Sequence, residues 1–145
     1  MIQRHRELLT MLGVLAVTVS AWYIFSPFLT VIESSAQIPQ GIILVKGGFQ
    51  PGAYDVHGRA YIIRSEGKRI LHFEDFKTIN GPDLHVYLAF GQGTKDFIDL
   101  GQIKATSGSA NYEIPSSVDI RKFNTVLIWS EPLRMLFSFA ELKTP

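Results

Sequence analysis

The chain has no cysteine among its 145 residues. Without cysteine it can form no disulfide, offer no thiolate to a metal and carry no thiol redox couple. Both oxidising and reducing compartments accommodate such a chain, so this absence does not locate the protein. The net charge is also small, +1 at pH 7. Because a nucleic-acid-binding domain needs a basic footprint, nucleic acid is not an expected partner.

The motifs of common catalytic and nucleotide-binding sites are absent as well. There is no Gly-x-Gly-x-x-Gly, and the fragment Gly-Gln-Gly-Thr-Lys at 91–95 lacks the spacing of a phosphate loop. The serines have no nucleophile-elbow context, and no nucleophile can be paired with a base. The sequence therefore favours a protein that is not an enzyme, although it leaves the question open.

One long apolar run is present near the N-terminus. Residues 8–32 contain no charged side chain, and as a helix they would extend about 37 Å, more than the hydrocarbon thickness of about 30 Å. Trp22 and Tyr23 lie in the later part of the run, where amphipathic rings favour the membrane interface, and Pro27 is expected to end or kink the helix. The run predicts one transmembrane helix over residues 8–32.

The flanking charges predict the orientation of this helix. Arg4 and Arg6 precede it, whereas Glu33 is the first charge after it. By the positive-inside rule, residues 1–7 are cytoplasmic, and a single-pass signal anchor in the cell membrane holds the rest outside, with the lipid bilayer as one partner. The alternative is a signal peptide cleaved near the Ser-Ser-Ala of 34–36, which would release a secreted protein. Hydrophobic regions of signal peptides span about 7–15 residues, so the length favours a retained anchor.

Beyond the apolar run, the pattern is that of β-structure. Residues 33–40 are polar, contain proline and are predicted to form a tether, and residues 41–145 form the folded domain. Turn clusters separate short apolar segments at intervals too short for helices. The segments are 42–45, 59–64, 69–76, 84–90, 97–100, 111–114, 125–130 and 135–140. The prediction is all-β: an antiparallel β-sandwich or barrel of about eight strands.

A core for this domain can be named from the apolar positions, because a domain of this size does not need disulfides to bury one. The expected members are Phe49, Leu71, Phe73, Phe76, Leu84, Val86, Leu88, Ile103, Tyr112, Val126, Ile128, Leu136 and Phe139.

The densest turn signal lies between the apolar segments 69–76 and 84–90. Asn80 and Gly81 tolerate positive φ, Pro82 restricts its own φ, and Asp83 can hydrogen-bond to nearby backbone. Leu84 then begins an alternation of apolar and other residues with a period of two. We expect a rigid corner between two strands.

Several motifs in a fixed order accompany this corner. They are Gly47-Gly48-Phe49, His57-Gly58, 71–76, 80–88, Asp99-Leu100-Gly101, Gly108, 111–115 and 126–129. Over roughly residues 41–142 this order resembles the DM thirteen domain family, the "electron transfer DM" domain. The resemblance implies an accessory domain of redox or electron-transfer systems, related in architecture to DOMON-type modules. The family commonly has a cysteine after its tryptophan, whereas here Ser130 follows Trp129, so it is open whether any redox role survives.

We expect a non-catalytic ligand- or partner-binding module outside the membrane. The corner and the loop around His57 are its expected contact points. The candidate binding residues are His57, Asn80, Asp83, Trp129 and Ser130. The sequence names neither the protein or small-molecule partner nor the oligomeric state.

Two alternatives stay open. In the first, the protein transfers electrons through a bound haem or metal, with His57, His72 and His85 as ligands. No pair of these histidines has a ligand-like short spacing, so the leading expectation is no metal and no cofactor. In the second alternative, the domain is a structural surface-assembly module.

Overall fold

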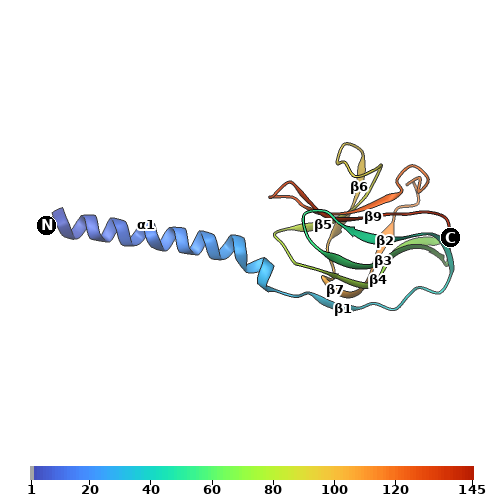
Figure 1. Ribbon diagram of the computed structural model, residues 1–145, viewed down its shortest axis with the longest axis horizontal. Helices are drawn as coiled ribbons and strands as arrows, with labels where there is room; N and C mark the ends of the chain where they lie inside the picture. Colours follow the sequence, from blue (N-terminus) through green and yellow to red (C-terminus); the bar gives the residue numbers. More distant parts are fainter. Residues whose placement is uncertain (1) are drawn as a thin grey trace.

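The computed structural model describes residues 2–145. Helix α1 (Ile2–Phe25) is followed by the short 3-10 helix η1 (Ser26–Leu29), which contains Pro27. The α-helix thus ends before Pro27, as expected for a residue that disfavours helical geometry in the residue before it. Figure 1 shows α1 standing clear of a β domain, with the two chain termini at opposite ends of the molecule.

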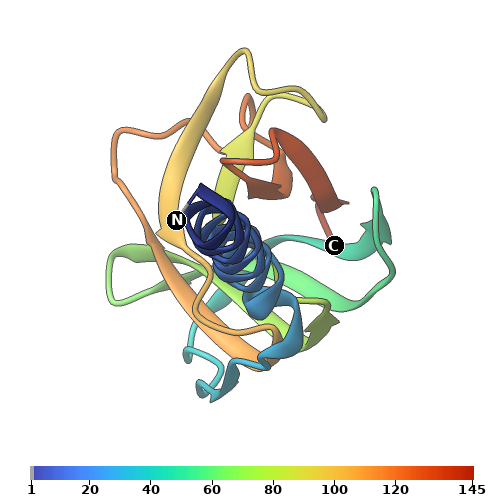
Figure 2. The same ribbon diagram turned by 90° about the vertical axis from the view of Figure 1, so that its left-hand side faces the viewer.

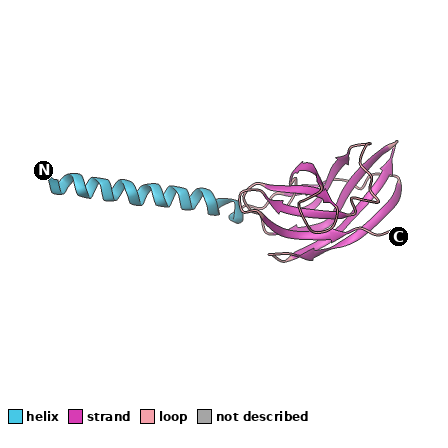
Figure 3. Ribbon diagram, turned by 90° about the horizontal axis from the view of Figure 1, so that it is seen from above, coloured by secondary structure: helices cyan, strands magenta, loops and turns pink. Residues whose placement is uncertain are grey.

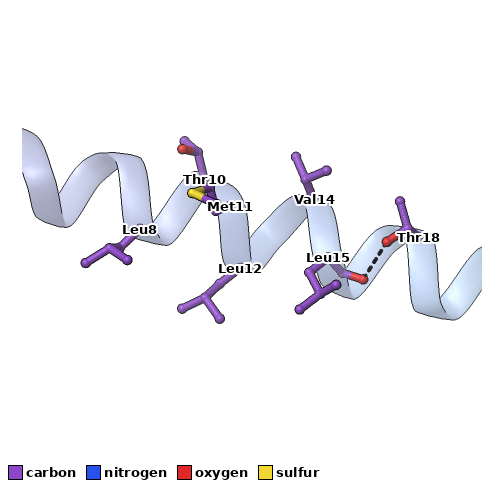
Figure 4. A pocket seen from close by; sticks show the side chains of 7 residues that line it. All are labelled: Leu8, Thr10, Met11, Leu12, Val14, Leu15 and Thr18. Carbon is purple, nitrogen blue, oxygen red and sulfur yellow. Dashed lines mark hydrogen bonds between the residues drawn. The ribbon is translucent and has the colours of Figure 1, made fainter.

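From Leu8 on, helix α1 is apolar on all sides, and nearly every side chain of the helix from Gln3 on is exposed. The segment Gln3–Leu29, of 27 residues, is long and apolar enough to cross a membrane. The serine and threonine hydroxyls of α1 are satisfied within the helix, because Thr10, Thr18 and Ser20 donate to the carbonyls of Glu7, Leu15 and Ala16. Figure 4 shows side chains along this helix, mainly apolar ones such as Leu8 and Leu12, extending from opposite sides of the ribbon. An apolar helix without protein cover fits lipid surroundings.

Nine strands follow the helix. They are β1 (Glu33–Ser35), β2 (Ile42–Pro51), β3 (Val56–Ser65), β4 (Lys68–Thr78), β5 (Leu84–Ala89), β6 (Phe97–Gln102), β7 (Ser107–Ile114), β8 (Thr125–Ser130) and β9 (Met135–Glu141). The eight strands expected from the sequence correspond to β2 through β9, so the predicted all-β fold is confirmed. Strand β1 was not expected, and it pairs with β7 in parallel whereas the other recorded pairings are antiparallel.

The strands form one curled sheet in the order β1-β7-β4-β3-β2-β9-β8-β5-β6. Strand β2 joins its two halves: residues 42–48 pair with β3, and residues 49–51 pair with β9. The sheet therefore folds over on itself as a half-barrel with two layers. Figure 3 shows the strands running roughly in the direction of the helix.

The main core lies between the two layers and contains most of the residues expected there, including Phe73, Leu88 and Ile128. Leu136 and Phe139 differ from the rest. They belong to a second apolar cluster, with Tyr87 and Leu127. On β8, Val126 and Ile128 point into the main core, so Leu127 between them points to the opposite face. Leu127 pairs with Phe139 on β9. The second cluster therefore lies on the outer face of β5, β8 and β9.

The segment that connects the helix to the domain is docked onto the domain. Phe28 packs against Tyr54 and Phe137, with ring centroids 6.3 Å apart in both pairs. The backbone of Ile32 exchanges hydrogen bonds with Thr106. Figure 2, seen along the molecule from the helix side, shows α1 projecting from within the outline of the domain.

The segment 33–40, which was predicted to be a tether, continues along β7. Strand β1 pairs with residues 107–109, and the side-chain amide of Asn111 donates to the carbonyl of Gln37 at 3.0 Å. Gly108, at φ +107°, leaves room for this strand, because a Cβ at that position would lie 2.0 Å from the carbonyl oxygen of Ser34.

Candidate functional site

The corner at 80–83 is built as a fixed unit. The buried side chain of Asn80 accepts a hydrogen bond from the backbone N–H of Gly81 at 2.9 Å and donates to the hydroxyl of Thr30 at 3.0 Å. Gly81 packs so closely that a Cβ would lie 2.5 Å from the ring of Phe137. Asn80 therefore links the corner to the chain that leaves the helix, which places the corner at the helix end of the domain.

Ser130 holds the same corner from the neighbouring strand. Its side chain is fully buried, and its hydroxyl donates to the carbonyl of Pro82 at 2.7 Å. The backbone N–H of Glu131 also donates to the carbonyl of Asp83, at 3.3 Å. The residue that replaces the family's cysteine is thus a support for the loop, out of contact with solvent.

His85 lies beside the corner, on the outer face of β5, between two carboxylates. Its Nδ1 is 2.9 Å from Asp99 and its Nε2 is 3.2 Å from Asp83, which also accepts a hydrogen bond from the side-chain amide of Gln102 at 2.9 Å. We call these four residues, His85, Asp83, Asp99 and Gln102, the His85 cluster. Both carboxylate side chains are 44% exposed, so the cluster is open to solvent.

The cluster favours the protonated imidazole. Partial burial lowers the pKa of His85, but the hydrogen bond and charge of Asp99, together with Asp83, outweigh that effect and leave the pKa raised. The protonated form can donate to both carboxylates at once, which the neutral form cannot. With His85 protonated, the cluster carries a net charge of −1.

Asp99 and Gln102 were not among the residues predicted from the sequence. A bulge in β6 brings them to His85: the pairs His85–Gln102 and Tyr87–Asp99 enclose one more residue on β6 than on β5. Gly101, at φ +105°, lies in this bulge, and its N–H donates to Asp99 at 2.8 Å. The motif Asp99-Leu100-Gly101 was noticed, and its glycine was the signal for a bulge.

Trp129 is directly opposite His85 in the pairing of β5 with β8. The side chain of Trp129 is partly buried and packs against the second apolar cluster, and its partner on β9 is Leu136. The structure therefore places an aromatic surface next to the His85 cluster. The His85 cluster can bind a cationic or hydrogen-bond-donating group, and Trp129 can contact an apolar part of the same ligand.

His57 is placed elsewhere. It is exposed near the start of β3 and lines an open cleft of about 450 Å³. The other residues of this cleft are Tyr54, Asp55, Lys77, Thr78 and Ile79. The cleft belongs to the β3–β4 layer and reaches Ile79 beside the corner, whereas the His85 cluster lies on the outer face of β5 and β6 on the other side of the corner.

The three candidate histidine ligands do not meet. His72 is buried on β4, 2.6 Å from the side-chain oxygen of Asn111, and His57 pairs with a residue five positions away from it on that strand. His85 lies in the other layer. Within residues 2–145 there is no group of three or more histidine, aspartate or glutamate side chains that could hold a metal ion. These histidines therefore do not fit a shared metal or haem site.

A comparison with protein families gives one match. The model of the family described as Electron transfer DM13 matches residues 48–142, which is more than half of the chain. The match includes the corner, all four members of the His85 cluster, and Trp129. No curated protein and no solved structure matches the chain.

Proposed function

The chain belongs to the Electron transfer DM13 family, and on that premise we propose that it is a membrane-anchored, extracytoplasmic, non-catalytic module that binds a partner at the His85 cluster. The observation that carries the proposal is the position of His85 between two exposed carboxylates and opposite Trp129. The family's description supports a place as an accessory of a redox system.

The arrangement supports binding more than catalysis. A general base needs a free ring nitrogen, whereas both nitrogens of His85 face carboxylates. Asp83 and Asp99 keep oxygen atoms available to a further donor, since each carboxylate has about four acceptor positions. A lysine or arginine side chain, presented by a protein outside the membrane, matches the net negative charge and the aromatic surface of Trp129.

Photocrosslinking in the native membrane tests this proposal. A photoreactive residue in place of Gln102 is expected to give an adduct of defined mass that Asp99→Asn strongly reduces, because the substitution removes one of the two negative charges that attract the partner's cation. The same residue in place of Glu113, exposed on β7 in the other layer, is the matched control. An adduct from position 113 alone, or one indifferent to Asp99→Asn, contradicts the proposal. An adduct of the chain with itself identifies a surface-assembly module instead.

We further propose that the anchor is retained. Residues 28–36 belong to the folded domain through Phe28, the hydrogen bonds of Ile32 and the pairing of β1, so cleavage near residues 34–36 would remove an edge strand and its packing. The mature protein isolated from membranes should have the mass of a chain that includes α1. A mass that begins after Ala36 would refute retention.

The orientation has its own test. In intact cells, a membrane-impermeant maleimide should label Glu113→Cys and leave Gln3→Cys unlabelled, because we propose that Arg4 and Arg6 hold the N-terminus inside. The chain's lack of cysteine makes each variant a single-thiol protein. The reverse labelling pattern would invert the proposed topology.

Electron transfer through a bound haem or metal is the second candidate, and the description of the family is what favours it. Because the chain has no cysteine, it has no thiol couple of its own. Electron transfer would therefore require a bound redox group. A visible absorption spectrum and metal analysis of the detergent-purified full chain, made in a haem-competent host, decide the matter. A stoichiometric chromophore or metal would favour this candidate over the binding module.

A further inference from the structure

Three loops gather at the end of the domain from which the helix emerges. Loop 52–55 contains Tyr54, which packs on Phe28, and loop 79–83 contains Asn80, which is bonded to Thr30. The β8–β9 hairpin, 131–135, joins them through the hydrogen bond from Glu131 to the corner. We call these three loops the proximal rim. In Figure 1 the red hairpin extends back to the level of the last turn of the helical segment.

Apolar side chains are exposed on this rim. Ile79 is 40% exposed, and Leu133 and Met135 are each 38% exposed. Leu29 and Val31, in the adjoining chain, are 74% and 68% exposed. These residues form an apolar fringe around the point where the chain enters the domain, which is the arrangement expected of a surface facing lipid.

The length of the helix places this fringe at the edge of the bilayer. About 20 helical residues cross the hydrocarbon layer, and a count of 20 from Leu8, the first residue after the charged N-terminus, ends near Phe28. Phe28 is the residue that packs under the rim. The docking of residues 28–36 onto the domain restricts the movement of the rim relative to the helix.

The charges of the rim are mixed in sign. The exposed charges are Arg134 and the adjacent Lys77 on one side, and Asp55, Asp83 and Glu131 on the other. Because neither sign dominates, attraction to anionic lipid would be weak, and apolar contact must hold the rim to a membrane.

We propose that the proximal rim rests in the interfacial region of the lipid bilayer, with Leu133 and Ile79 among the acyl chains nearest the headgroups. The contact fixes the domain's orientation and turns the His85 cluster sideways, along the membrane surface. It does not depend on the identity of any partner bound there.

Fluorescence quenching by spin-labelled lipid tests the contact. Leu133→Cys and Ile79→Cys, each in the full chain, are labelled with an environment-sensitive fluorophore and reconstituted into phosphatidylcholine vesicles. Ile42→Cys is the control, because Ile42 is an apolar residue, 66% exposed, at the opposite end of the ten-residue strand β2. That strand places it about 30 Å from the rim.

With shallow spin-labelled lipid, the rim labels should lose at least about half of their fluorescence, since interfacial side chains lie about 5–10 Å inside the boundary. The label at position 42 should keep its fluorescence. Adding anionic lipid should leave this difference unchanged. Rim labels as unquenched as the one at position 42, or equal quenching at all three positions, would overturn the proposal. Two independent rim positions guard against a local effect of one substitution.

Discussion

Ser130→Cys restores the residue that the family commonly has after its tryptophan, and its outcome can be worked from the structure. Ser130 is 0% exposed and donates to the carbonyl of Pro82 at 2.7 Å. A thiol is a weaker donor, so the variant loses most of a hydrogen bond worth about 0.5–1.5 kcal/mol net. For a domain of this size that loss lowers the melting temperature by roughly 2–9 °C.

The new thiol should also be inert. A fully buried group reacts only when the structure opens, and an opening free energy of about 4 kcal/mol slows the reaction about 1000-fold. Burial also raises the pKa of a thiol and so reduces its thiolate fraction. We therefore expect iodoacetamide to alkylate the folded Ser130→Cys protein at least about 1000-fold more slowly than the same protein in denaturant.

The assay compares alkylation rates, followed by mass spectrometry, in folded and denatured full-length protein. Glu113→Cys, exposed on β7, is the control and should react at similar rates in both conditions. Fast alkylation of folded Ser130→Cys would refute the argument, because it would mean that the corner opens readily or that position 130 is accessible. Ser130→Ala should destabilise the domain at least as much as Ser130→Cys, since it removes the donor altogether.

Two further predictions concern the His85 cluster and the corner. The pKa of His85 is raised, so its contribution to the free energy of unfolding is complete below about pH 6.5 and is lost as pH rises through the folded-state value. Denaturant unfolding from pH 5 to 9 should show a loss of at most about 1 kcal/mol that His85→Gln removes and that His57→Gln preserves. Gly81→Ala should cost about 1–3 kcal/mol, because its Cβ would meet the Phe137 ring at 2.5 Å. Gly48→Ala, with no atom within 4 Å of its Cβ, should cost much less, and equal losses would contradict the packing argument.

Strands β2 to β9 were predictable because each contains a short apolar segment bounded by turn residues, and such patterns act locally. The alternation through Leu84, Val86 and Leu88 placed their side chains in the core, where they lie. The same rule could not place Leu136 and Phe139, which are apolar but lie on the outer face of β9. Apolar character predicts burial, and which face is buried depends on the neighbouring strands.

Strand β1 illustrates a different limit. Residues 33–35 are polar and short, and nothing in them signals a strand; they pair with β7 because Gly108 opens the edge of the sheet to them. The local sequence of residues 33–40 therefore predicts a tether. It could not predict that these residues dock onto a strand that is distant in the sequence.

The residues of the candidate site also differ in whether the sequence could predict them. Asp83 and Trp129 were selected from the sequence because they occur in or beside a motif; Asp83 belongs to the His85 cluster and Trp129 lies next to it. Asp99 and Gln102 escaped selection because a bulge at Gly101 brings them to His85, and pairing register is a property of two strands together.

The sequence by itself determined the apolar helix, the absence of thiol chemistry, the succession of strands and the family, since each follows from composition or from order along the chain. Tertiary structure decided which residues meet. It buried Ser130 beneath the corner, set His85 between two carboxylates and docked residues 28–36 onto the domain. The physical reason is that long-range pairing and packing depend on how distant segments fit one another, which no local pattern encodes.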